Sequence, residues 1–243
     1  MASAQHTPDG SPSSALRTAG LRFRYANGPQ LAFPDIDLPR GGELLLVGRS
    51  GCGKSTLLQL VAGLLDPSAG SVAVGGHDMH AVRGAARDRL RGRSVGMVFQ
   101  TFQLLQGFSA LENVLVAMSM ADLADRDARA RADGLLRSLG IERLDARVED
   151  LSVGQQQRVA IARALACRPA LVLADEPTAS LDPENAMNAV RVLRDACRDA
   201  GAALLVVSHD PALEPHFERR MRLATAAAST ANGPHAAGQE VPA

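Results

Sequence analysis

The stretch GRSGCGKST, residues 48–56, decides how the rest of the chain is interpreted. It follows an apolar run at residues 43–47 and leads into residues 57–61, whose apolar side chains have helical spacing. A strand, a glycine-rich turn and a helix in this order form a phosphate-binding loop. The alternative is a glycine-rich turn that matches the pattern by chance, and the flanking strand and helix argue against it.

The residue types in this loop suit a bound polyphosphate. The glycines let backbone N–H groups turn inward around the phosphates, and the helix N-terminus adds the positive end of its dipole. Lys54 is expected to reach the β- and γ-phosphates, and the Ser55 hydroxyl is expected to bind Mg²⁺. The nucleotide-binding residues predicted in this stretch are Gly48, Ser50, Gly51, Gly53, Lys54, Ser55 and Thr56.

Lys54 is the only lysine in the chain, so arginine supplies 26 − 1 = 25 of the 26 basic residues. A planar guanidinium cannot replace a compact ammonium inside a phosphate loop. Lysine is therefore kept at the one position where a guanidinium could not replace an ammonium. The sequence predicts a nucleotide-binding protein.

The overall composition is that of an ordinary globular protein of 243 residues, long enough for one large domain or two small lobes. Its formal net charge of zero gives no reason to expect nucleic acid as a partner. The three cysteines, Cys52, Cys167 and Cys197, have neither metal-binding spacing nor the even number of a disulfide set, which favours a reducing cytosol. Without a signal segment or an apolar run of membrane-spanning length, the sequence predicts a soluble intracellular chain.

Strand-like and helix-like runs alternate along most of the chain. Strands are predicted at residues 21–25, 36–38, 43–47, 71–74, 96–99, 170–174 and 203–207. Helices are predicted at residues 54–64, 85–91, 111–120, 125–139, 153–167 and 183–200. Continuous apolar strands beside helices predict an α/β fold with a largely parallel sheet covered on both faces.

The same pattern predicts how the chain is divided. Residues 1–14, rich in Ser, Pro and Ala, and residues 225–243 are predicted to be disordered. Residues 15–224 are predicted to form one domain. Because residues 100–167 are mostly helical, they are expected to form a lobe inserted into a core made of residues 15–99 and 168–224.

Two carboxylates, Asp175 and Glu176, end the apolar run at residues 171–174. Asp175 is expected to hold Mg²⁺ through Ser55 or a water, as the second acidic element of phosphate-loop enzymes does. Glu176 is expected to accept a proton from, or polarise, the water that attacks the γ-phosphate, a role typically worth about 10²- to 10⁴-fold in rate. The alternative, a solvated pair of carboxylates at a strand end, is disfavoured by the phosphate loop upstream.

The stretch LSVGQ, residues 151–155, followed by QQRVAIARAL, residues 156–165, discriminates best between families. Taken alone, it predicts an amphipathic helix capped by Ser152. Together with the phosphate loop and the two carboxylates, it closely resembles the signature of the ABC-transporter ATPases. The resemblance covers roughly residues 21–223 and implies a P-loop NTPase core with a largely parallel sheet, a small antiparallel β region and an inserted α-helical subdomain.

Further positions match elements of that family, and their roles are implied by the resemblance. Tyr25 matches the aromatic residue that stacks on adenine, the alternative being an ordinary strand residue. Gln100 matches the glutamine that contacts Mg²⁺ or its water and links the helical lobe to the core. Asp182, in ASLD at residues 179–182, matches a residue that crosses a dimer interface. His209 matches the switch histidine that senses the γ-phosphate, the alternative being a structural histidine.

The resemblance also implies partners and cofactors. ATP and Mg²⁺ are expected between two subunits arranged head to tail, most simply two copies of this chain. Ser152, Gly154 and Gln155 of one subunit then face the γ-phosphate bound by the other, and the Gly154 N–H at a helix N-terminus suits that anion. An integral membrane subunit is expected to dock near residues 100–108, which places the chain on the cytoplasmic face of the inner membrane.

Two positions and one segment depart from the family pattern. Val153 stands where the signature usually has its first glycine. Arg49 takes a loop position that is usually small or proline. Residues 217–224 are interpreted as lacking the usual final turn and strand.

Residues 98–114, VFQTFQLLQGFSALENV, are similar to the branch of the family that serves lipoprotein release and macrolide-type export. Phe102, Leu104, Leu105 and Phe108 crowd apolar groups into a segment with neither strand nor helix periodicity, so an exposed apolar patch including Leu104 or Phe108 is expected. The alternatives left open are an amino-acid importer, a regulator of cell-wall enzymes, and a soluble ATPase of cluster assembly.

Overall fold

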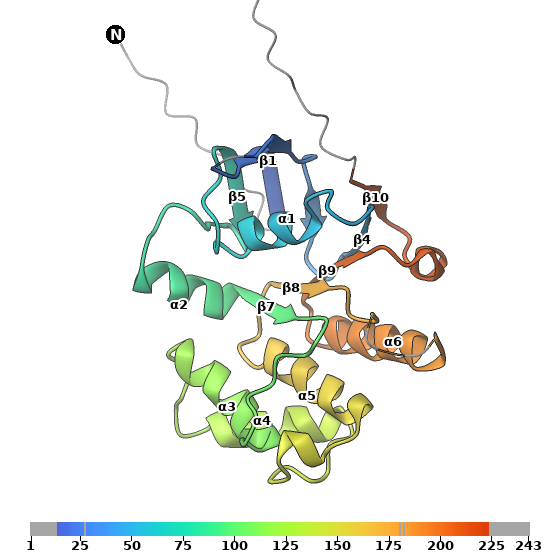
Figure 1. The fold of residues 1–243 in the computed structure, drawn as a ribbon. Helices are drawn as coiled ribbons and strands as arrows, with labels where there is room; N and C mark the ends of the chain where they lie inside the picture. The colour runs from blue at the N-terminus through green and yellow to red at the C-terminus, as the bar shows by residue number, and fades with distance from the viewer. Residues whose placement is uncertain (1–13, 27, 180, 182, 224–243) are drawn as a thin grey trace, which may run out of the picture.

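Five parallel strands form the central sheet, in the order β10-β4-β9-β8-β7. The computed structural model describes residues 14–26, 28–179, 181 and 183–223. Figure 1 shows this sheet across the middle of the molecule. The strands are β4 (Glu43–Val47), β7 (Val95–Val98), β8 (Leu171–Asp175), β9 (Ala203–Ser208) and β10 (Arg220–Arg222).

Helices cover both faces of this sheet, and a group of them lies beyond its lower side in Figure 1. Short 3₁₀ segments occur at Val148–Asp150 and Pro211–His216. The α-helices are α1 (Lys54–Val61), α2 (Ala85–Ser94), α3 (Ala110–Met120), α4 (Ala128–Ser138), α5 (Val153–Leu165) and α6 (Pro183–Asp199).

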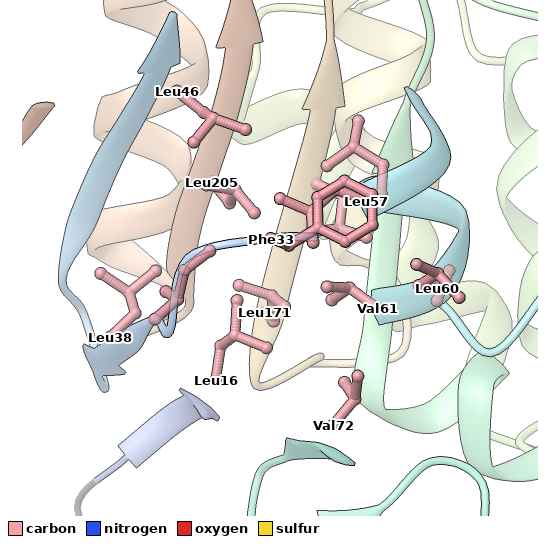
Figure 2. Packing of buried hydrophobic residues seen from close by; sticks show 14 of the residues in the cluster. Leu16, Phe33, Leu38, Leu46, Leu57, Leu60, Val61, Val72, Leu171 and Leu205 are labelled. Atoms are coloured by element: carbon pink, nitrogen blue, oxygen red, sulfur yellow. The ribbon is translucent and has the colours of Figure 1, made fainter. Parts of the chain in front are cut away.

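The central strands send alternate side chains into two different cores, as the two-residue repeat of a strand requires. Leu171 and Leu205 belong to the core that includes α1, which Figure 2 shows together with Leu57. Val172 and Leu204, the neighbours of these residues in sequence, belong to the core that includes α6. Burial on both faces explains why these strands are continuously apolar.

A second, antiparallel sheet packs over the α1 side of the central sheet. Its strands follow the order β2-β1-β5-β6, and β3 pairs with β1. Leu16 lies opposite Val74 and Thr18 opposite Val72 in the register of β1 and β5. The strands are β1 (Ser14–Arg24), β2 (Gln30–Ala32), β3 (Asp37–Pro39), β5 (Ala69–Val74) and β6 (His77–Asp78).

Helices α3, α4 and α5 enclose a third core. It contains Leu111 and Val114 from α3, Leu136 from α4 and Val159 from α5. Helix α3 begins with a capping box, in which Ser109 and Glu112 satisfy each other's backbone N–H groups. The predicted fold class, a largely parallel sheet with a small antiparallel region and a helical subdomain, is confirmed.

Several boundaries differ from the sequence prediction. The first strand begins at Ser14, inside the predicted disordered leader, and runs to Arg24 rather than to residue 25. Strands β2 and β6 were not predicted, because runs of two or three residues carry no periodicity. The remaining predicted disordered residues, 1–13 and 225–243, lie outside the described part of the chain.

The prediction that residues 217–224 lack a final strand is wrong. Strand β10 pairs in parallel with β4, with Met221 opposite Leu46, and the Leu223 N–H donates to the Val47 carbonyl. The strand was missed because it is three residues long and both of its ends are exposed arginines. Its half-buried Met221 packs against the core on the α1 side.

Gly96 in β7 lets α5 approach the central sheet closely. A Cβ atom at this position would lie 2.2 Å from the Ala164 carbonyl oxygen of α5, which is closer than any side chain tolerates. Since the obstacle is backbone, it cannot move aside as a flexible side chain would.

We expect Gly96→Ala to destabilise the protein by about 1–3 kcal/mol, because it forces α5 away from β7. At this chain length each kcal/mol corresponds to a shift in melting temperature of about 2–4 °C, so thermal unfolding measures the effect.

Gly134→Ala is the matched control. Gly134 is exposed in α4, and a Cβ there meets no described atom within 4 Å, so helix propensity should raise stability by about 0.5–1 kcal/mol. Equal melting temperatures for the two variants would contradict the close packing.

Candidate nucleotide-binding site

An open cavity of about 680 Å³ lies at the carboxyl ends of the central strands. Ligands of parallel α/β sheets bind at this edge, where loops from several strands converge. The antiparallel sheet contributes a further wall. The lining residues are Tyr25, Pro29, Leu31, Ser50, Gly51, Gly53, Lys54, Ser55, Thr56, Gln100, Asp175, Glu176 and His209.

The loop between β4 and α1 supplies the floor of this cavity. Gly51 and Gly53 have φ of 78° and 99°, a region that glycine adopts without strain. Gly53 is the N-cap of α1 and provides no side-chain cap, so the first N–H groups of the helix keep the capacity to bind an anion.

The Lys54 ammonium is held inside the loop by backbone oxygens. Its Nζ donates to the Gly48 carbonyl at 2.8 Å and to the Arg49 carbonyl at 3.2 Å, and only 8% of the residue is exposed. Gly48 lies outside the cavity lining but supports the loop. A Cβ there would meet the sulfur of the buried Cys52 at 2.6 Å.

Glu176 follows β8 and is held by three neighbours. Its Oε1 lies 2.8 Å from His209 Nδ1 and 3.7 Å from Lys54 Nζ. Its Oε2 accepts from the Ser208 hydroxyl at 3.1 Å. Glu176 has φ of 48°, and a non-glycine residue in this region stores on the order of 1–3 kcal/mol of strain that its surroundings must offset.

Asp175, Ser55 and Gln100 bring three oxygen-bearing side chains to the same cavity. Burial raises the pKa of the Asp175 carboxyl, and Glu176 raises it further, while a hydrogen bond with Ser55 and the charge of Lys54 lower it. A carboxylate, a hydroxyl and an amide oxygen are hard donors of the kind that Mg²⁺ prefers. The residues present therefore fit a magnesium ion.

Tyr25 lies at the rim of the cavity with 48% of its surface exposed. Its hydroxyl is hydrogen-bonded to Thr56 Oγ1 at 2.8 Å, and its ring packs edge-on against Phe23 with ring centres 4.7 Å apart. These two contacts fix the ring at the rim of the cavity.

The signature residues are not part of this cavity in the described chain. Ser152, Gly154 and Gln155 lie at the start of α5, where Ser152 and Gln155 form a capping box. A Cβ at Gly154 would meet no described atom within 4 Å, and Val153 is 52% exposed. This helix start is therefore exposed in the described chain. Asp182 lies outside the described residues.

The sequence analysis missed Ser208, which holds Glu176 and is fully buried. The signal was available, because this hydroxyl directly precedes His209 in VVSHD, residues 206–210. Pro29 and Leu31 were also missed, and no sequence signal identifies them, because they line the cavity only through the pairing of β2 with β1.

The apolar segment after Gln100 is only partly exposed. Leu105 and Phe108 are 40% and 43% exposed, whereas Phe102 and Leu104 are buried in the core of α3, α4 and α5. The expected exposed apolar patch is therefore present at Leu105 and Phe108, but Leu104 is not part of it. A segment without periodicity gives no basis for choosing which of its side chains point inward.

The ABC transporter family matches residues 33–179. The chain is 45% identical over 216 residues to the lipoprotein-releasing system ATP-binding protein LolD 2 of Caulobacter vibrioides, which covers 87% of this chain and 94% of that protein. It is also 45% identical over 227 residues to LolD of Anaeromyxobacter dehalogenans, with 90% and 94% covered.

Solved structures give the same result. The fold is similar to cbiO1 of Clostridium perfringens, part of the ABC transporter complex cbiONQ, with a TM-score of 0.77, 30% identity, and 87% and 85% of the two chains covered. It is also similar to the dimeric ATP-binding cassette MJ0796 in a post-hydrolysis state bound to ADP and Pi, with a TM-score of 0.69, 29% identity, and 86% and 94% covered. The chain belongs to the ABC transporter family, as one of its ATP-hydrolysing cassettes.

Proposed function

We propose that this cassette hydrolyses ATP between two head-to-tail copies and drives a membrane partner of the lipoprotein-release type. The observation that carries the catalytic part is the position of Glu176 in the cavity. It lies beside Lys54 of the phosphate loop and is hydrogen-bonded to His209 and Ser208. A carboxylate in this place serves a reaction at the terminal phosphate.

The proposed binding roles follow from the lining of the cavity. The N–H groups of residues 50–56 and the Lys54 ammonium bind the phosphates, and the Tyr25 ring stacks on the base. Ser55, Gln100 and Asp175 would hold Mg²⁺, which neutralises charge on the β- and γ-phosphate oxygens when it is bound.

The proposed reaction is the attack of a water on the γ-phosphorus. Glu176 accepts a proton from this water as its oxygen bonds to phosphorus, and the bond to the β,γ-bridging oxygen breaks to release ADP and phosphate. His209 holds the Glu176 carboxylate and senses the γ-phosphate. The contacts with Lys54, Ser208 and His209 hold the carboxylate in place before the nucleotide arrives and offset the strain of its backbone.

The dimer part of the proposal rests on the separation of the signature from the cavity. Ser152, Gly154 and Gln155 lie at a helix start that is open in the described chain. A second copy places this positive helix end against the γ-phosphate, and Asp182 crosses the interface. The similar cassette MJ0796 is itself dimeric, which supports this arrangement.

The membrane partner is proposed from the similar proteins. Several are named lipoprotein-releasing system ATP-binding proteins. Among the described residues, no helix is long and apolar enough to cross a membrane. We therefore propose that the chain acts at the cytoplasmic face of the inner membrane through a separate integral subunit, which docks at Leu105 and Phe108.

We expect Glu176→Gln to lower the rate of ATP hydrolysis about 10²- to 10⁴-fold, because the amide cannot accept the proton. ATP binding should be retained, and a nucleotide-bound dimer should accumulate in size-exclusion chromatography with ATP. Lys54→Ala should lose both binding and hydrolysis. Glu142→Gln, an exposed carboxylate distant in sequence, is the control and should behave as wild type. Hydrolysis by Glu176→Gln at the wild-type rate would disprove the role of Glu176.

We expect Phe108→Asp to abolish co-purification with the membrane subunit, because a charge replaces the apolar contact. Nucleotide binding by the isolated chain should not change. Met120→Asp is the matched control, since Met120 is 76% exposed in the same helical layer but lies at the far end of α3. Leu104→Asp is unsuitable, because it charges a buried core. A folded Phe108→Asp variant that still assembles would refute the docking site.

A further inference from the structure

Arg163 connects the last turn of α5 with the segment that follows Gln100. Its Nη2 donates to the Phe102 carbonyl at 2.7 Å, and its Nη1 donates to the Gln103 carbonyl. One planar guanidinium thus bridges two consecutive carbonyls across 60 residues of sequence. The two donors of a guanidinium fork suit paired acceptors of this kind.

The two acceptors lie in a strained turn. Phe102 and Gln103 have φ of 56° and 47°, which is uncommon for non-glycine residues and especially so for two in succession. The Phe102 N–H bonds back to the Phe99 carbonyl, and the Gln103 N–H to the Thr101 carbonyl. Such a turn persists only where surrounding groups hold it, and Arg163 holds it with two hydrogen bonds while Phe102 is packed in the helical core.

The charge of Arg163 has no counter-ion among the described residues. Burial alone lowers the pKa of this guanidinium, and no described carboxylate pairs with it. The residue is half-buried, and its printed hydrogen bonds go to the two carbonyls of the turn. The guanidinium therefore holds the turn rather than neutralising a carboxylate.

The α5 end of the contact between Arg163 and the turn is held firmly. The missing side chain at Gly96 lets the Ala164 carbonyl, next to Arg163, lie directly against β7. The chain runs from β7 straight to Gln100, and Figure 1 shows α5 below the end of that strand. Arg163 therefore fixes the turn relative to the strand from which Gln100 emerges.

A different side chain holds the far end of the same segment. The buried Asn113 of α3 accepts from the Leu105 N–H at 2.7 Å and donates to the Leu105 carbonyl at 3.2 Å. The exposed Leu105 is thus fixed from α3, and the turn after Gln100 from α5. Arg163 thus holds the part of the segment near the cavity, and Asn113 holds the part near the surface.

We propose that Arg163 is a positioning residue for ATP hydrolysis, which holds the Phe102–Gln103 turn so that Gln100 faces the cavity. The inference rests on the proposed function. Arg163 does not line the cavity, and it acts through Gln100, which does. Because α5 begins at the signature, Arg163 also links the position of the signature helix in each subunit to that of its Gln100.

The test is steady-state ATP hydrolysis by the full chain as a function of ATP and Mg²⁺. Arg163→Ala should lower kcat about tenfold or more and raise the Mg²⁺ requirement, while KM for ATP stays within about twofold, because the phosphate loop is unchanged. Gln100→Ala should show the same pattern. The double variant should have a kcat within about twofold of Gln100→Ala alone, because two residues that act through one contact are not additive.

Arg93→Ala is the matched control. Arg93 of α2 donates to the Ala121 and Asp122 carbonyls, and Asp122 also has a positive φ of 54°, so the variant loses the same kind of contact away from the cavity. It should lower the melting temperature but keep kcat within about twofold of wild type. Combined with Gln100→Ala, it should add no further loss of kcat.

The inference would be overturned if a folded Arg163→Ala variant had a wild-type kcat. It would also be overturned if Arg93→Ala lowered kcat as much as Arg163→Ala does. Multiplied losses of kcat in the Arg163→Ala, Gln100→Ala double variant would overturn it as well. If Arg163→Ala does not fold, Arg163→Lys keeps the charge and must show the same dependence on Gln100. A wild-type chain that does not hydrolyse ATP overturns the proposed function, whereas an active wild type with independent losses overturns only the role of Arg163.

Discussion

The buried Lys54 ammonium is the interaction on which the site depends. A charge in this position is costly unless it is paired and hydrogen-bonded, and here two backbone carbonyls of the loop and the Glu176 carboxylate surround it. The same contacts shape the loop around the lysine and bring the end of β8 next to the start of α1. The chain uses arginine at its other basic positions, which are compatible with a larger and flatter cation.

Three of the five described non-glycine residues with positive φ follow the carboxyl ends of central strands. Glu176 follows β8, and Phe102 and Gln103 come shortly after β7, all with positive φ. Each such residue costs on the order of 1–3 kcal/mol. Hydrogen bonds to charged groups contribute about 1.5–3 kcal/mol each, so the bonds of Glu176 and Arg163 are of the size needed to offset this strain. The strain thus persists because charged side chains compensate for it locally.

The sequence predicted the elements that have a clear apolar pattern and the residues whose types suit a particular chemistry. The continuous apolar runs of β4, β8 and β9 predicted the sheet because both faces of these strands are buried. The phosphate loop and the Asp175 and Glu176 pair were located because their residue types follow from the chemistry of phosphate and metal binding. Burial of Leu104 beside exposed Leu105 was not predictable, because it depends on contacts with α3. The β10 strand was missed for a similar reason, since its only signal is pairing with β4.

The alternation of β8 and β9 side chains between two cores has a consequence for catalysis. Strands packed on both sides resist displacement, so Asp175, Glu176 and Ser208 lie at the ends of firmly held strands. Dipoles held in this way need little reorganisation as charge develops on a transferred phosphoryl group. The remaining walls, which carry Tyr25 and Gln100, come from the antiparallel sheet and from the segment after β7. The cavity thus combines carboxylates that follow the central strands with walls that belong to separate structural units.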